Sequence, residues 1–103
     1  MKINLPTKSI ISSVPVKIEY RKDPKLEDGT PVFGYYDSNK DLIVIDKDLK
    51  KDKLKFFLIH EIVEQYNDLY ELNLSHQKIT KIGIDIANYI NNNYEIIKFL
   101  LEK

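Results

Sequence analysis

The chain has 103 residues, 43% of them hydrophobic, and its sixteen basic residues balance sixteen acidic ones. These values predict one soluble domain spanning residues 1–103, and they exclude the strong basic excess of most nucleic-acid-binding proteins. Cysteine is absent, so disulfides and thiolate metal sites are excluded, and no apolar run approaches the roughly 20 residues of a membrane span. The N-terminal stretch has no apolar signal-peptide core, so we expect a cytoplasmic protein.

The first half of the chain predicts three strands. Residues Val14–Tyr20 alternate apolar and polar side chains, which is typical of a half-buried strand, and Pro15 near its start predicts a position at the sheet edge. Residues Val32–Asp37 and Asp41–Asp46 flank a tight turn and predict a hairpin. Gly34, inside the first of these two strands, predicts a bulge or a close backbone approach.

The N-terminal 13 residues predict no regular element, because Pro6 interrupts the pattern. Ile10 and Ile11 are expected to pack against the core.

The first long helix is predicted over Leu54–Tyr70, with Asp48 or Asp52 as its cap. Helical spacing places six apolar side chains on one stripe, and this stripe is expected to face the sheet. Its members are Ile59, Ile62, Val63, Tyr66, Leu69 and Tyr70.

Two further helices are predicted towards the C-terminus. Ser75 is a good N-cap for a helix over His76–Asn91, whose apolar row is expected to be Ile79, Ile82, Ile86, Tyr89 and Ile90. A last short helix over Tyr94–Glu102 is expected to cover an open edge of the sheet with Ile97, Leu100 and Leu101. Strands come first and helices follow, so the predicted class is α+β, with a small antiparallel or mixed sheet of about three strands packed on two to three helices.

A candidate metal site lies on the first helix. His60 and Glu64 are four residues apart, so their side chains lie on one face and can bind the same divalent cation, such as zinc. Glu61 projects to the side, where a general base for an attacking water would lie. The alternative interpretation is structural: Glu61, Glu64, Gln65, Asp68 and Glu71 would form a solvated helix face.

The order of elements and this motif resemble the minimal zincin metallopeptidases. More closely, the stretch IHEIVEQYNDLYELNLSHQKI, after two strands and before a last segment NNNYEIIKFLLEK, is similar to small gluzincin-like proteins of phages and mobile elements. The resemblance covers about Pro31–Lys103. It implies a zincin-like fold, a divalent metal and a peptide or protein substrate, with Glu61 catalytic. The motif departs from the family's HExxH, because Glu64 gives HExxE.

The identity of the third ligand stays open at this stage. The resemblance places it at Ile84, which cannot bind metal, and the neighbouring Asp85 shares a row with solvated residues. His76 is the other candidate. If the two helices fold back through a short connection, His76 lies near Tyr70, roughly 15 Å from His60. A histidine there would instead stabilise the turn by a hydrogen bond to the connection between the helices.

Three functions follow from these alternatives. The first is a metal-dependent peptidase whose active site is degenerate. The second is a catalytically inactive scaffold with the same fold, used by a phage or mobile element to bind a host or partner protein. The third is a purely structural helix face without a ligand. All three exclude nucleic acid and membrane as partners.

Overall fold

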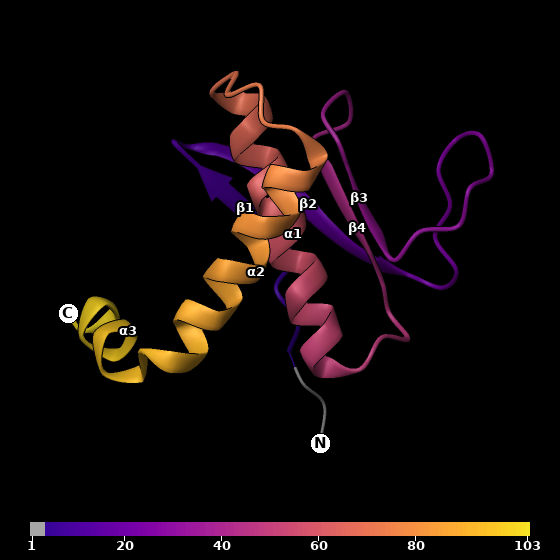
Figure 1. Ribbon diagram of the computed structural model, residues 1–103. Helices are drawn as coiled ribbons and strands as arrows, with labels where there is room; N and C mark the ends of the chain where they lie inside the picture. Colours follow the sequence, from indigo (N-terminus) through magenta and orange to yellow (C-terminus); the bar gives the residue numbers. More distant parts are fainter. Residues whose placement is uncertain (1–3) are drawn as a thin grey trace.

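The computed structural model describes residues 4–103, which form a four-stranded mixed sheet and three helices, as expected for the α+β class (Figure 1). The elements are β1 Lys8–Ile11, β2 Val14–Arg21, β3 Gly34–Asp37, β4 Leu42–Asp46, α1 Lys51–Leu69, α2 His76–Asn92 and α3 Tyr94–Leu101. The sheet thus has one strand more than predicted. Residues 1–3 of the N-terminal stretch lie outside the described residues. Within the described part of the chain, no helix is long and apolar enough to cross a membrane.

The strand order is β1-β2-β4-β3, with β2 and β4 parallel and the two outer pairs antiparallel. The predicted β3–β4 hairpin is confirmed. The edge position predicted from Pro15 is wrong, because β2 lies inside the sheet. Pro15 is tolerated there because β4 pairs with β2 only from Lys17 onward, so Pro15 faces a single neighbouring strand, β1.

Strand β1 was not predicted from the sequence. It joins β2 through Ser12 and Ser13, whose φ angles of 48° and 66° are both positive, as in the type I′ turns that connect tight hairpins. Ile11 is buried, but Ile10 is exposed, so only one of the two isoleucines packs against the core.

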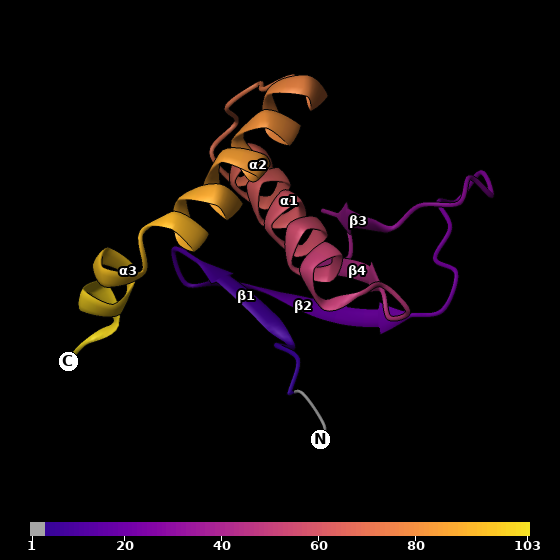
Figure 2. The same ribbon diagram turned by 60° about the horizontal axis from the view of Figure 1, so that its bottom comes forward.

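Helix α1 lies across one face of the sheet (Figure 2). Leu54 completes a core with four strand residues, Val16, Ile18, Ile43 and Ile45. The helix begins at Lys51 rather than Leu54, and its N-cap is Lys50, so neither predicted aspartate caps it. Asp52 instead lies in the first turn, where its negative charge interacts favourably with the positive N-terminal end of the helix dipole.

The expected sheet-facing stripe of α1 is wrong. Of its six members only Val63 is buried, and Tyr66 and Tyr70 are exposed. The row that faces the sheet continues from Leu54 into polar side chains, and strand residues form hydrogen bonds with two of them. The Gln65 amide donates to the backbone oxygen of Ser9 at 3.3 Å, and Asp68 accepts from Tyr36.

Helix α2 packs on α1 through the buried residues Ile79 and Gly83. The rest of its predicted apolar row is exposed. Helix α3 then projects away from the sheet, as Figures 1 and 2 show, and Leu100 and Leu101 are 68% and 77% exposed. The expectation that this helix covers a sheet edge is therefore wrong. A single residue, Asn93, separates α2 from α3, and so short a link does not return the chain to the sheet.

Candidate metal centre

Helix α1 supplies the first two candidate ligands. His60 and Glu64 lie one turn apart, and the Nε2 atom of His60 is 3.7 Å from the Oε1 atom of Glu64. His60 is 9% exposed, because α2 packs directly over it. The pairing predicted from the i, i+4 spacing is therefore present in the structure.

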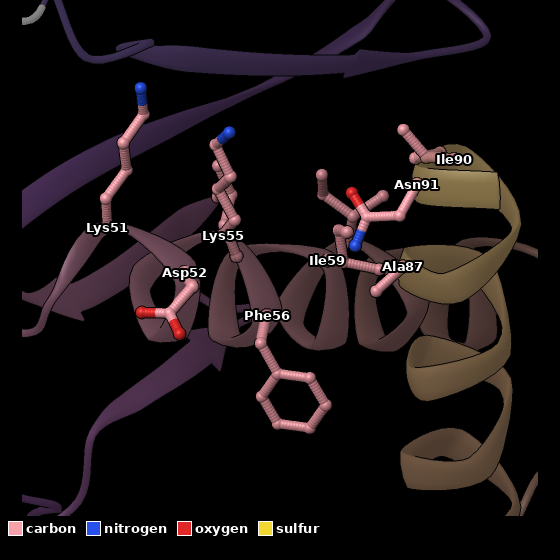
Figure 3. Close-up of a pocket in the computed structure, with 10 residues that line it drawn as sticks. Lys51, Asp52, Lys55, Phe56, Ile59, Ala87, Ile90 and Asn91 are labelled. Carbon is pink, nitrogen blue, oxygen red and sulfur yellow. The ribbon is translucent and has the colours of Figure 1, made fainter. Parts of the chain in front are cut away.

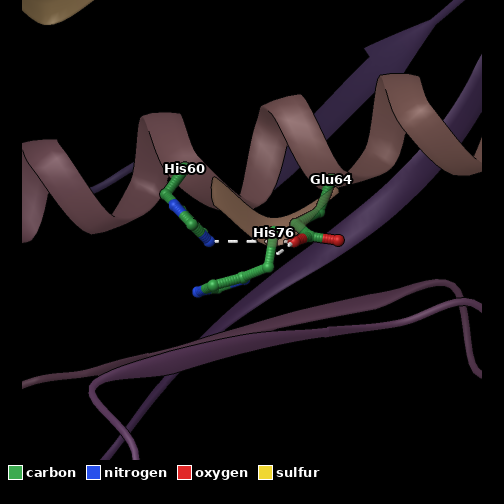
Figure 4. A group of neighbouring side chains, drawn as sticks. All are labelled: His60, Glu64 and His76. Atoms are coloured by element: carbon green, nitrogen blue, oxygen red, sulfur yellow. Dashed lines mark ion pairs between the residues drawn. The ribbon is translucent and has the colours of Figure 1, made fainter. Parts of the chain in front are cut away.

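The third candidate ligand, His76, is the first residue of α2. Ser75 caps this helix as predicted, its hydroxyl accepting from the backbone N–H of Lys78 at 3.2 Å. The Nδ1 atom of His76 is 3.9 Å from the Glu64 carboxylate, and the two imidazole centroids are 5.3 Å apart. Figure 4 shows both histidines beside the same carboxylate. One ligand atom from each of the three residues lies within 4.8 Å of the other two.

The predicted distance of roughly 15 Å between His60 and His76 is therefore wrong. It assumed that α2 begins beside the end of α1. Instead the connection runs back along α1, because the side-chain oxygen of Asn67 accepts a 2.8 Å hydrogen bond from the backbone N–H of Leu74. Positive φ angles at Glu71 and Asn73 turn the chain there. The first residue of α2, His76, thus lies beside Glu64 in the middle of α1.

Gly83 allows the two helices to pack closely. A Cβ atom at this position would lie 3.5 Å from the Cα atom of His60, so the α2 backbone passes directly over the ligand. With Ile79 buried one turn earlier, this contact fixes the rotation of α2 and thus the direction of His76.

Burial shapes the electrostatics of the ligands. Loss of solvent lowers the pKa of His60 below its ordinary 6.5; the nearby Glu64 opposes this shift and His76 adds to it. The His60 imidazole is therefore neutral at pH 7, with a lone pair free for a metal ion.

Glu61 lies on the sheet side of α1 and is only 5% exposed. Its carboxylate approaches β3 at Gly34, where an added Cβ would be 3.5 Å from Oε2 and 3.0 Å from the backbone oxygen of Val44. The close approach predicted at Gly34 is therefore confirmed. Burial, and secondarily the charge of Glu64, raise the pKa of Glu61 to about 8. With Gln65 also buried, this side of α1 is not the solvated face that a purely structural role predicts.

The chemistry of this donor set fits a divalent cation. Two imidazoles and one carboxylate are the ligands of many catalytic zinc sites, and three protein ligands leave a fourth position for water or substrate. At zinc–ligand distances of about 2.1 Å, ligand atoms lie roughly 3.4 Å apart, so the observed 3.7 Å and 3.9 Å to Glu64, with all three ligand atoms within 4.8 Å of one another, require side-chain movements alone. Asp85 is exposed and stands outside this group. His60, Glu64 and His76 can thus hold a metal ion.

The chain matches no known protein family, and neither a curated protein nor a solved structure is detectably similar to it.

Proposed function

We propose that the protein is a zincin-like, metal-dependent peptidase in which His60, Glu64 and His76 hold a zinc ion. The observation that carries the proposal is the convergence of these three side chains from two helices, with a buried carboxylate at the residue after His60. Two imidazoles and a carboxylate lie together here although the chain has only two histidines. Chance pairing on a solvated helix does not account for a buried His60.

The chain's own residues divide the work as follows. A bound zinc ion lowers the pKa of water and polarises a carbonyl group. Glu61 accepts the proton of the attacking water and passes it to the leaving nitrogen. A carboxyl with a raised pKa suits the second step, because it retains a proton near neutral pH until the leaving group takes it.

Strand β3 is the natural place for a peptide substrate. It is one edge of the sheet, and Gly34 at its start lies against Glu61. An extended peptide can add to such an edge through backbone hydrogen bonds, which need no particular side chain. A peptide bound there would lie beside the general base.

A second candidate function is a catalytically inactive scaffold that binds a partner protein. The burial of Glu61 favours it, because a carboxyl with a pKa of about 8 is mostly protonated at pH 7 and then cannot act as a base. A metal ion bound nearby would favour the ionised form of Glu61, which can act as a base. Metal binding therefore distinguishes the peptidase from the inactive scaffold.

Cleavage of unfolded casein by untagged protein with one equivalent of zinc tests the proposal. We expect cleavage by the wild type and none by Glu61→Gln, which keeps all three ligands. Zinc bound by both proteins without cleavage by either would contradict the peptidase and favour the scaffold. Failure of the wild type to bind zinc would contradict the metal site as well.

A further inference from the structure

The exposed apolar residues of this protein are concentrated at its C-terminal end. Of the large hydrophobic residues exposed in residues 4–103, more than half lie on α2 and α3. They are Ile82, Ile84, Ile86, Tyr89, Ile90, Tyr94, Ile96, Phe99, Leu100 and Leu101. Large apolar side chains left exposed in such number on two consecutive helices indicate an interaction site.

The same region carries an open groove. Helices α1 and α2 diverge and leave a space of about 670 Å³ between the N-terminal half of α1 and the C-terminal half of α2. Its walls are mostly apolar, and Figure 3 shows Phe56, Ile59, Ala87 and Ile90 around it. An amphipathic helix is the usual occupant of an apolar groove between two helices.

Helix α3 has the composition of such an occupant. Its sequence YEIIKFLL is apolar over most of its circumference, and its two polar residues, Glu95 and Lys98, are three residues apart and share one face. Glu95, in the first turn of α3, carries a negative charge. The rim of the groove has an excess of positive charge, because Lys51 and Lys55 point the same way there and are accompanied by one acidic residue, Asp52 (Figure 3).

The helix cannot fill the groove of its own chain. The groove is lined by the last turns of α2, so α3 would have to reverse direction and lie antiparallel to them. Two antiparallel helices need a connection of about two to five residues, whereas Asn93 alone separates α2 from α3. The complementary surfaces of one chain are thus kept apart.

We infer that two copies of this chain form a symmetric dimer in which α3 of each copy occupies the α1–α2 groove of the other. The exchange is reciprocal, so it closes at two copies and buries both exposed helices at once. The dimer does not depend on the metal site, because His60 and His76 lie outside the groove.

Sedimentation velocity of the full chain in the presence of a chelator tests the inference. The wild type is expected to sediment as a dimer of about 24 kDa, twice the 12.1 kDa of one chain. Two variants change exposed residues: the double variant Leu100→Asp/Leu101→Asp on α3, and Ile90→Asp in the groove. Each variant should be a folded monomer. Leu26→Asp, a change at an exposed leucine of a distant loop, should remain a dimer.

Cross-linking identifies the surfaces in contact. The chain has no cysteine, so variants carrying Lys55→Cys or Leu101→Cys each have one thiol. A mixture of the two should form a disulfide-linked heterodimer on oxidation. A monomeric wild type at all concentrations would overturn the inference. Leu101→Cys cross-linking only to itself would also overturn it, because α3 would then pack against α3.

Discussion

The side-chain oxygen of Asn67 accepts a hydrogen bond of 2.8 Å from the backbone N–H of Leu74, and this bond places the start of α2 beside the middle of α1. The backbone N–H of Leu72 also donates to the backbone oxygen of Asn67 at 3.0 Å, so two hydrogen bonds hold the connection to this residue, and the side-chain bond is the one nearer to His76. One amide group thus links a turn to a candidate metal ligand.

Asn67→Leu tests this link. Groups that orient metal ligands typically contribute about 10–100-fold to metal affinity, so we expect a loss of that size in zinc binding measured by competition with a chromophoric chelator. Asn88→Leu is the matched control, because Asn88 is exposed on α2. Equal zinc affinity in wild type and Asn67→Leu would show that His76 is positioned by other contacts.

Gly83 provides a graded test of helix packing. Gly83→Ala should fold normally, because its Cβ would lie in ordinary contact, 3.5 Å from the His60 Cα, and it should stabilise α2 by about 0.5–1 kcal/mol. The side chain in Gly83→Ile has three more carbon atoms than the one in Gly83→Ala. It should push α2 away from His60 and so lower both the melting temperature and the zinc affinity. If both variants bind zinc like the wild type, the close contact does not position the ligands.

Glu61 should make the metal-free protein less stable as the pH rises. Its pKa is raised from 4.5 to about 8 on folding, so between these values the folded state holds a proton that the unfolded state has lost. This stability is fully present below pH 4.5 and is lost as the pH rises through about 8. His60 acts oppositely, because its lowered pKa costs stability only as the pH falls below 6.5.

The useful window is therefore pH 6.5 to about 8, where the free energy of unfolding should fall by about 1.4 kcal/mol per pH unit at most. Urea titrations with chelator present measure it. Glu61→Gln should remove most of the slope. A wild type with the same stability across the window would contradict the burial of a protonated Glu61.

Tyr36 fastens β3 to α1. Its hydroxyl donates to the Asp68 carboxylate at 3.0 Å, and burial together with that carboxylate raises its pKa to about 12. Tyr36→Phe should cost about 0.5–1.5 kcal/mol in thermal unfolding and leave zinc affinity unchanged, because Tyr36 touches none of the three ligands. The neighbouring Asp68→Asn should have a smaller effect, since an amide oxygen still accepts the bond. A loss of zinc binding in Tyr36→Phe would contradict this division of roles.

Local signals predicted part of this architecture. The β3–β4 hairpin and the start of α2 at Ser75 follow from short-range patterns, and so does the pairing of His60 with Glu64. Strand β1 was missed because it has only four residues and its Ser12-Ser13 turn lacks the glycine or asparagine that usually marks such turns.

Relations between distant residues could not be predicted in the same way. The face of α1 was assigned from its apolar stripe, but a partly polar row packs on the sheet instead, where Ser9 and Tyr36 form hydrogen bonds with Gln65 and Asp68. The place of His76 depends on the hydrogen bond between Asn67 and Leu74 and on the packing of Gly83 against His60, which helix geometry alone does not contain. The zincin-like resemblance and the peptidase activity remain predictions.

The central claim is that His60, Glu64 and His76 hold one metal ion together, and metal content after dialysis against zinc measures this directly. The untagged wild type should retain one zinc per chain. His76→Ala should lose it while remaining folded, since His76 is largely exposed, and Asp85→Ala should keep it. One zinc per chain in His76→Ala, or a wild type that retains none, would contradict the claim.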